Sequence, residues 1–358
     1  MSGTHPPGRR FSKVFEGIPG AYYREAAGAF QEARAQTGCR ASTTLRVAGV
    51  TFRLEFADDQ TPGIILPTLA HSTSADDPAA DWTIRCWEDA STGGTMPLPT
   101  PVMLTGQRHN CLFTVSDQRY RTFYHGWMET LMFIDREGEG YACYLDAAQL
   151  PMYEKAAPLR QIFNTALNLR GRQIVHAAAV GHPHGSLLLA GPPRSGKSTL
   201  AVQCLLQGMG FQSDDLCVIS QDDPPRSWSI YNVAKLRDDS LSRVPSGLPL
   251  QSFIEGTEKK HFFHVNRVFP ERLLPSAPLK AIVIPTITGE STSRLLQATR
   301  LEAMKALIPW SVHEVPTSDN LGEKIMLKAL SRLPAYRLEL GGNAEQTFTL
   351  LQTLLHEA

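Results

Sequence analysis

The residues whose types and spacing most clearly indicate chemistry lie between Gly191 and Ser198, in the order Gly-Pro-Pro-Arg-Ser-Gly-Lys-Ser. This segment has the form G-x-x-x-x-G-K-[ST], the pattern of loops that bind phosphate groups. In such a loop, backbone N–H groups and the N-terminus of the following helix face the phosphate oxygens. The lysine reaches the β- and γ-phosphates, and the last hydroxyl ligates Mg²⁺. The segment therefore predicts binding of a nucleoside triphosphate, ATP, together with Mg²⁺.

The chain on either side of this loop has the pattern that such a loop requires. Before it, Ser186–Ala190 is a short apolar run, typical of a buried strand. After it, apolar residues recur at helical spacing until Gly208, a residue typical of a helix C-terminus. An ordinary glycine turn is the alternative. Such a turn requires neither a buried strand before it nor a helix after it, so these two flanking patterns favour a phosphate-binding loop. The residues expected to contact the nucleotide are Gly191, Pro192, Pro193, Arg194, Ser195, Gly196, Lys197, Ser198 and Thr199.

Asp214 and Asp215 are the carboxylates best placed to assist the loop. They follow the predicted helix and precede the apolar residues 216–219, so a strand can bring them back beside the loop. Phosphoryl transfer needs a carboxylate near Mg²⁺ and a base for the attacking group. A polar turn is the alternative for such a pair. No other carboxylate in the sequence has comparable placement.

His176 lies on the strand predicted before the loop. A hairpin over residues 174–190 would place its imidazole beside the phosphates, although a single histidine on a strand is more often structural. His261 and His264 are three positions apart, an odd step along a strand. A strand would place them on opposite faces, which does not favour a shared metal ion.

Basic residues of the second half are further candidates for contact with the transferring phosphoryl group. Lys235 comes first among them, because an apolar strand pattern surrounds it. The alternative for each is a place on a solvated face, where most basic side chains lie. The four candidates are Lys235, Lys259, Lys260 and Arg267.

The order of these residues resembles the catalytic half of HPr kinase/phosphorylase, a bacterial serine kinase. That family has a histidine, a phosphate loop and an Asp-Asp pair in the order seen here at His176, 191–198 and Asp214–Asp215. Residues 206–215 also resemble the stretch that leads into the family's acidic pair. The resemblance is clear over residues 171–240 and weaker over the rest of the second half. It implies a mixed-sheet α/β fold similar to that of phosphoenolpyruvate carboxykinase.

The resemblance also implies a role for each matching residue. Lys197 would contact the phosphates, and Ser198 would ligate Mg²⁺. Asp214 would act as the base toward the acceptor hydroxyl, while Asp215 would support the metal. His176 would lie beside the γ-phosphate. Which of the two aspartates is the base stays open.

Several departures from the family pattern bear on the acceptor. Arg194 stands where the family loop usually has a glycine, and Thr199 where it usually has a glutamate. The glycine-rich signature after the acidic pair is absent, and residues 231–235 occupy its place. HPr is therefore not the expected substrate. The chain is more similar to a divergent branch that accompanies peptide-tailoring gene clusters, including those of lasso peptides, which implies a peptide or small-protein acceptor.

Composition limits the remaining possibilities. The chain has 358 residues, a formal net charge of zero and six cysteines without metal-ligand spacing. A neutral chain has no overall field that recruits nucleic acid or an anionic membrane, and no apolar run is long enough to span a bilayer. The first residues, taken as a loose leader over 1–20, have no signal-peptide pattern. We therefore expect a cytoplasmic protein with no nucleic-acid or membrane partner; the oligomeric state stays open.

The elements that must position these residues fall into two halves. Residues 1–150 form a β-rich domain, mostly antiparallel over 40–147, with a possible role in acceptor recognition. Its aromatic residues are expected to fill a core, with a peptide-gripping face as the alternative: Trp82, Trp87, Tyr120, Phe123, Tyr124 and Trp127. Residues 151–170 form a connecting helix, and 171–358 form the α/β kinase-like domain, with strands over 174–180 and 229–236 and a helix over 301–308.

The sequence thus favours an ATP- and Mg²⁺-dependent kinase that phosphorylates a serine-type hydroxyl. A nucleotide-operated ATPase or switch protein is one alternative, and a kinase of a small metabolite is another. The Asp-Asp pair distinguishes a kinase from an ATPase or switch protein. Phosphoryl transfer needs a base that faces a hydroxyl, whereas a switch needs a residue that positions water.

Overall fold

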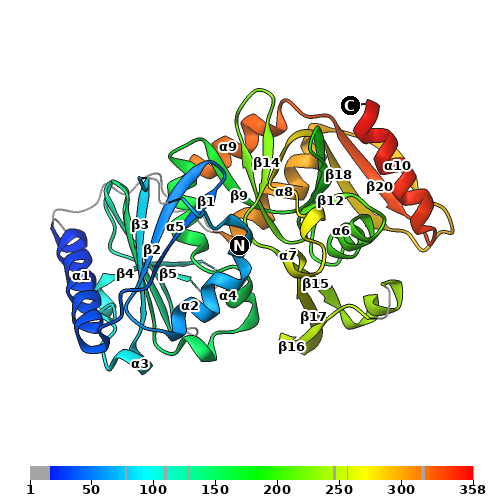
Figure 1. The fold of residues 1–358 in the computed structure, drawn as a ribbon. Coiled ribbons are helices and arrows are strands. Elements are labelled where there is room, and N and C mark those ends of the chain that lie inside the picture. The colour runs from blue at the N-terminus through cyan, green and yellow to red at the C-terminus, as the bar shows by residue number, and fades with distance from the viewer. Residues whose placement is uncertain are drawn as a thin grey trace. The chain divides into compact units, whose positions relative to one another are not determined.

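The computed structural model describes residues 17–76, 79–108, 111–126, 129–244, 247–255, 257–315 and 319–357. The chain divides into two compact units (Figure 1). Unit 1 comprises Met1–Ser42, Arg53–Pro62 and Trp82–Gln149, and unit 2 comprises Thr43–Phe52, Gly63–Asp81 and Leu150–Ala358. The second unit therefore draws two short segments from the first half of the sequence. Of the leader expected at 1–20, residues 1–16 lie outside the described ranges, and helix α1 already begins at Ile18.

An eight-stranded sheet runs through the first half of the chain, in the order β1-β2-β3-β8-β7-β6-β5-β4. The pairs from β4 to β8 are antiparallel, whereas β3 and β8 are parallel. The strands are β1 (Ser42–Val47), β2 (Val50–Phe56), β3 (Trp82–Glu88), β4 (Leu104–Arg108), β5 (Cys111–Thr114), β6 (Tyr120–His125), β7 (Thr130–Asp135) and β8 (Glu139–Tyr144). The helices of this half are α1 (Ile18–Thr37), α2 (Gln60–Ile65) and α3 (Asp89–Thr92).

Aromatic residues of this half pack inward, as expected. Trp82, Trp87 and Phe123 are buried, and Trp87 shares a core cluster with Phe30 and Tyr141. Tyr120 and Tyr124 are partly buried against the same cluster. The prediction that these aromatics fill a core is confirmed for the five described residues, and Trp127 lies outside the described ranges.

Unit 2 is built on a nine-stranded mixed sheet. Its main path runs β12-β10-β11-β18-β14-β13-β9, and β20 pairs with both β18 and β19. The strands are β9 (Arg172–His176), β10 (Ala178–His182), β11 (Gly185–Leu189), β12 (Gly210–Ser213), β13 (Leu216–Ser220), β14 (Arg226–Ser229), β18 (Ser276–Ile287), β19 (Arg294–Ala298) and β20 (Ala335–Leu340). Strands β11, β18 and β20 run parallel to one another, so their carboxyl ends meet at one edge.

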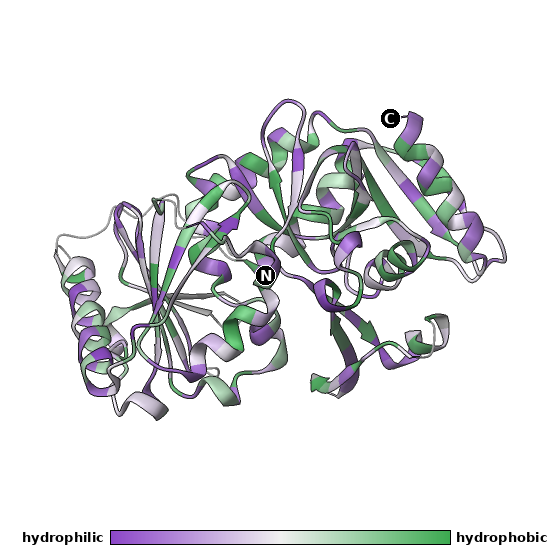
Figure 2. Ribbon diagram, in the orientation of Figure 1, coloured by the Kyte–Doolittle hydropathy of each residue, from purple (hydrophilic) through white to green (hydrophobic). Residues whose placement is uncertain are grey.

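Helices form two apolar clusters with this sheet. One cluster contains residues of α6 (Lys197–Leu206) and α10 (Ala344–Glu357), and the other contains residues of α8 (Arg300–Glu314) and α9 (Leu321–Leu330). Figure 2 shows hydrophobic and hydrophilic stretches alternating along α10, as expected for a helix with one face in a core. Mixed sheets with helices agree with the α/β class expected for the second half.

In two stretches of the second half, an element predicted as single is two separate elements in the structure. The single helix expected over 151–170 is two, α4 (Met152–Ala156) and α5 (Arg160–Asn168), because Pro158 interrupts the backbone and Leu159 is left-handed with φ 59°. The strand expected over 174–180 is also two, since β9 ends at His176 and pairs with β13, whereas β10 pairs with β11 and β12.

Strands β15, β17 and β16 form a separate three-stranded sheet, in that order. Of these three strands, β15 alone overlaps a strand predicted from the sequence. The strand expected over 229–236 is divided between β14 of the large sheet and β15 (Val233–Arg237) of this sheet. Strands β16 (Gln251–Glu255) and β17 (Glu258–His264) were not predicted. The remaining short helix, α7 (Val265–Val268), follows β17 directly.

Candidate functional site

The loop of residues 191–196 connects the end of β11 to the start of α6. Ala190 donates its backbone N–H to the carbonyl of Val283 on β18 (2.9 Å), so the chain enters the loop while still held to the sheet. The loop therefore lies at the carboxyl edge of the parallel strands. Strand, loop and helix follow one another as the sequence pattern predicted.

Gly196 has a backbone that favours glycine. Its φ is 100°, in the left-handed region, and a Cβ at this position would lie 2.8 Å from Cδ1 of Leu340. Gly196 is also the N-cap of α6, and no side chain caps the helix there. The first N–H groups of an α-helix have no partner within the helix, so this end offers donors to an anion.

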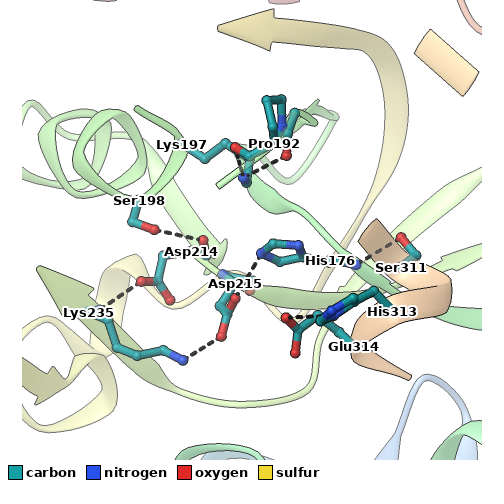
Figure 3. Close-up of polar contacts among 12 residues, drawn as sticks. His176, Pro192, Lys197, Ser198, Asp214, Asp215, Lys235, Ser311, His313 and Glu314 are labelled. Atoms are coloured by element: carbon teal, nitrogen blue, oxygen red, sulfur yellow. Dashed lines mark hydrogen bonds and ion pairs between the residues drawn. The ribbon is translucent and has the colours of Figure 1, made fainter. Parts of the chain in front are cut away.

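Lys197 turns back over the loop that precedes it. Its Nζ donates to the carbonyl oxygens of Gly191 (2.8 Å) and Pro192 (3.0 Å), as Figure 3 shows. The residue is only 5% exposed, and burial lowers the pKa of its ammonium group, although Asp215 and Asp214 act in the opposite direction. A buried cation thus lies against the loop that is expected to hold phosphate.

Asp214 lies beside the first turn of α6. The Ser198 hydroxyl donates to the backbone carbonyl of Asp214 (3.2 Å), and Oδ2 of Asp214 accepts the backbone N–H of Lys235 (2.7 Å). The residue is 2% exposed, and this burial raises the pKa of its carboxyl to about 7, partly offset by the Lys235 cation. Its carboxyl group can therefore take up and release a proton near neutral pH.

Asp215 has the opposite environment. Burial alone would raise its pKa, but its carboxylate pairs with Nζ of Lys235 and with Nε2 of His176 (3.2 Å). These two partners hold the pKa of Asp215 well below its usual value, while the two aspartates raise the pKa of Lys235 against the effect of burial. Adjacent residues thus reach contrasting charge states through different contacts.

His176 reaches Asp215 through strand pairing. It is the last residue of β9 and lies opposite Leu216, the residue directly after Asp215. Its backbone N–H donates to the Ser311 hydroxyl of α8 (3.0 Å), which fixes the strand end. Its Nδ1 is buried without a hydrogen-bond partner among the described residues. The β10–β11 hairpin does not include His176, so the expected hairpin over 174–190 was wrong, although His176 does meet the acidic pair.

Glu314 is a third carboxylate at the site, which the sequence analysis missed. It is the last residue of α8, and Figure 3 shows it near Asp215 and His176. The negative charge of Glu314 acts to raise the pKa of both Lys197 and Lys235. The expectation that no other carboxylate had comparable placement was therefore wrong. The sequence pattern predicts a helix that ends before Pro309, but α8 continues through this proline.

The two residues at which the loop departs from the family pattern contact neighbouring segments. Arg194, whose side chain is 72% exposed, pairs with Glu258 of β17. Its φ of 69° is unusual for a residue with a Cβ. Thr199 forms a hydrogen bond with Ser240 (3.1 Å), in the segment after β15. Both contacts tie the loop region to the three-stranded sheet and its flanking segment.

Most of the other basic and histidine candidates contact residues outside the acidic pair. Lys235 forms an ion pair with Asp215, and the charges of Asp214 and Asp215 also act on the ammonium group of Lys260. Lys259 lies 3.8 Å from Asp238, and His261 lies 2.8 Å from the same carboxylate. His264 bonds instead to Asn232 (2.9 Å). The two histidines therefore face different partners, as their odd spacing on β17 predicted.

The donor set near the loop fits Mg²⁺ better than a softer metal. Hydroxyl and carboxylate oxygens of Ser198 and Asp215 are the hard ligands that Mg²⁺ prefers. Among the described residues, no group of three or more His, Cys, Asp and Glu residues could hold a metal ion by itself. Mg²⁺ is usually held by one or two carboxylates together with substrate phosphates, so the set fits an ion that arrives with a nucleotide.

The comparisons with known proteins find a likeness among solved structures only. No family model matches the chain, and no curated protein matches it. Among solved structures, the chain is similar to the structure of the Hpr(Ser) kinase/phosphatase from Coxiella burnetii, with 12% sequence identity and a TM-score of 0.27. The match covers 52% of this chain and 95% of that chain. Within the part of the chain that the structure describes, no helix is long and apolar enough to cross a membrane.

Proposed function

We propose that the chain is a kinase that binds ATP with Mg²⁺ at residues 191–199 and transfers the γ-phosphoryl group to a hydroxyl. The observation that carries this proposal is the contact between Ser198 and Asp214 (3.2 Å). It joins the start of α6, where loops with this sequence pattern bind phosphate, to the backbone carbonyl of Asp214, whose own buried carboxyl group has a pKa of about 7. Phosphate-binding and proton-accepting groups therefore occur side by side.

The loop residues would hold the nucleotide. The N–H groups at the start of α6 would donate to phosphate oxygens, and Lys197 would exchange its bonds to Gly191 and Pro192 for bonds to the β- and γ-phosphates. The Ser198 hydroxyl would turn from the Asp214 carbonyl to the metal. When bound, Mg²⁺ supplies charge neutralisation at the phosphates.

Asp214 is the residue that we propose as the general base. Its deprotonated carboxylate would accept the proton of the acceptor hydroxyl as that oxygen attacks the γ-phosphorus and the bond to the β-phosphate oxygen breaks. A base works best when its pKa is close to the operating pH, and the carboxyl of Asp214 meets this condition. The backbone N–H of Lys235 holds Oδ2, which orients the group.

Asp215 would keep its negative charge throughout the reaction and support the metal. The Lys235 ammonium balances that charge, and contacts with Lys235 and His176 fix the orientation of the carboxylate. His176 would also lie near the γ-phosphate, as the sequence resemblance implies. This division of roles follows the two contrasting environments of the aspartates.

The acceptor is proposed to be a peptide or small protein. The support comes from the sequence, whose motif order resembles a serine kinase, whose departures at Arg194 and Thr199 speak against HPr as the acceptor, and which is similar to the branch found with peptide-tailoring genes. Unit 1 has no counterpart of the phosphate loop and is the part proposed to recognise the acceptor. The site's own chemistry requires only a hydroxyl that can approach Asp214.

The test follows the labelled γ-phosphate of ATP. The full chain is incubated with ATP and Mg²⁺, with and without hydroxyl-bearing peptides, and both peptide labelling and free phosphate are measured. We expect slow phosphate release without acceptor and transfer to a serine-containing peptide. Asp214→Asn should still bind ATP but should transfer about 10²–10⁴-fold more slowly. Rapid phosphate release without acceptor, unchanged in Asp214→Asn, would instead support the ATPase or switch alternative.

A further inference from the structure

Ile287 is a large apolar side chain that is left exposed beside the phosphate loop. It is the last residue of β18, and 55% of its surface is exposed. It lies opposite Leu340 of β20 in the parallel register, so the two side chains share a face of the sheet. Leu340 is only partly buried, at the rim of the cluster that contains α6.

Both side chains reach the N-terminus of α6. A Cβ at Gly196 would lie 3.6 Å from Cγ1 of Ile287 and 2.8 Å from Cδ1 of Leu340. The apolar surface of Ile287 and Leu340, called here the apolar platform, is thus continuous with the residues that would hold phosphate. Small-molecule sites commonly combine such an apolar wall with a few directed polar groups.

The strand order gives the loop two distinct sides. Strand β11 leads into the loop; β10 and β12 lie on one side of it, and β18 and β20 lie on the other. Asp214 follows β12, and Ser198 contacts it. Gly196 instead faces the apolar platform. A triphosphate whose γ end points toward Asp214 therefore extends its other end toward β18 and β20, which neighbour each other in Figure 1.

The apolar platform is held in place by the segments that follow its two strands. The Thr288 hydroxyl donates to the carbonyl of Leu340 (3.0 Å), and the N–H of Gly342 donates to the carbonyl of Glu290 (2.9 Å). These bonds join the chain after β18 to the chain after β20. The surface is therefore built before any ligand arrives, and little ordering would be required on binding.

We propose that the apolar platform of Ile287 and Leu340 binds the nucleobase of the nucleotide, which makes the ligand a nucleoside triphosphate rather than a simple polyphosphate. This inference rests on the proposed function, since it gives a binding surface to the nucleobase, the part of ATP opposite to the transferred phosphoryl group. The flat face of a base packs against apolar side chains, and burial of apolar surface supplies the affinity.

The test compares ATP with inorganic tripolyphosphate, which has the phosphates but no base. Binding of each to the full chain is measured by calorimetry for the wild type, Ile287→Ser and Ile287→Met. We expect Ile287→Ser to weaken ATP binding about tenfold and to leave tripolyphosphate binding unchanged. Ile287→Met keeps an apolar surface and should bind ATP nearly as the wild type does. Leu301→Ser is the matched control, because Leu301 is also exposed, at 60%, but lies on α8.

Each other outcome decides against the inference. Unchanged ATP affinity in Ile287→Ser, with wild-type binding of both ligands, refutes the apolar platform and leaves the proposed function intact. Equal weakening of ATP and tripolyphosphate also refutes it, since Ile287 would then act on the loop. Failure of the wild type to bind either ligand refutes the proposed function and the inference together.

Discussion

Replacement of Asp214 by asparagine should make the protein more stable, by an amount that depends on pH. Burial raises the pKa of this carboxyl from 3.8 to about 7 in the folded chain. A carboxyl with a raised folded-state pKa favours folding fully only below its unfolded pKa, and this contribution is lost as the pH rises through about 7. Above that pH, the folded protein carries a buried charge that the unfolded chain would expose to water. Asparagine carries no charge at any pH.

The size of the effect follows from the shift. Each pKa unit corresponds to about 1.4 kcal/mol, so the gain approaches about 4 kcal/mol at pH 8 and falls to about 2 kcal/mol at pH 5. Asparagine retains an oxygen that can accept the Lys235 N–H, so the local geometry should persist. Any effect of the new side chain that does not depend on pH cancels when the two pH values are compared.

Urea unfolding at pH 8 and pH 5, followed through the transition of unit 2, measures this difference. We expect Asp214→Asn to gain about 2–3 kcal/mol more at pH 8 than at pH 5, while phosphoryl transfer falls. Asp215→Asn is the control with the opposite sign. It removes a charge that Lys235 and His176 stabilise, so the free energy of unfolding should fall at pH 8. An equal gain at both pH values, or a loss at pH 8 in Asp214→Asn, would refute the reasoning.

Four further predictions follow from the same contacts. Lys197→Ala should weaken ATP binding in calorimetry while the fold stays intact by circular dichroism, and unchanged affinity would contradict the assigned loop. The rate of transfer should rise with pH through about 7, because Asp214 must be ionised to accept a proton; a rate profile flat from pH 5 to 9 would exclude it as the base. Lys235→Met should raise the Mg²⁺ concentration needed for half-maximal rate, since it frees the orientation of Asp215, and Lys235→Arg should restore it in part. A fragment that starts at Leu150 should fail to fold stably, because unit 2 includes residues 43–52 and 63–81; a soluble fragment that binds ATP would show that these segments are dispensable.

The loop and its flanking elements could be predicted because their signals are local. Glycines at 191 and 196, a short apolar run and a helical repeat all lie within a few turns of chain. Strand β20, Ala335–Leu340, carries a similar local signal, because Gly341 and Gly342 end its apolar pattern directly. Such signals depend on backbone conformation and periodicity, which the sequence carries without knowledge of distant contacts.

The contacts within the site could not be predicted in the same way. His176 meets Asp215 because β9 pairs with β13, and no local feature near Ala177 shows that the strand ends there. Glu314 reaches the site because α8 continues beyond Pro309, where a helix pattern usually stops. The end of β9 at His176 and the continuation of α8 past Pro309 both depend on packing against the sheet. This packing overrides the structure that the local sequence favours.

The two bonds that Lys235 makes to the acidic pair differ in how they respond to mutation. Its bond to Asp214 comes from the backbone N–H, which every residue except proline provides, whereas its bond to Asp215 comes from the side chain. A substitution at position 235 therefore reaches Asp215 and leaves the anchor of Asp214 in place. Sequence change at this single position would therefore alter how Asp215, the proposed metal-supporting carboxylate, is held while Asp214 keeps its backbone hydrogen bond, and loss of the lysine charge would raise the pKa of Asp214 further.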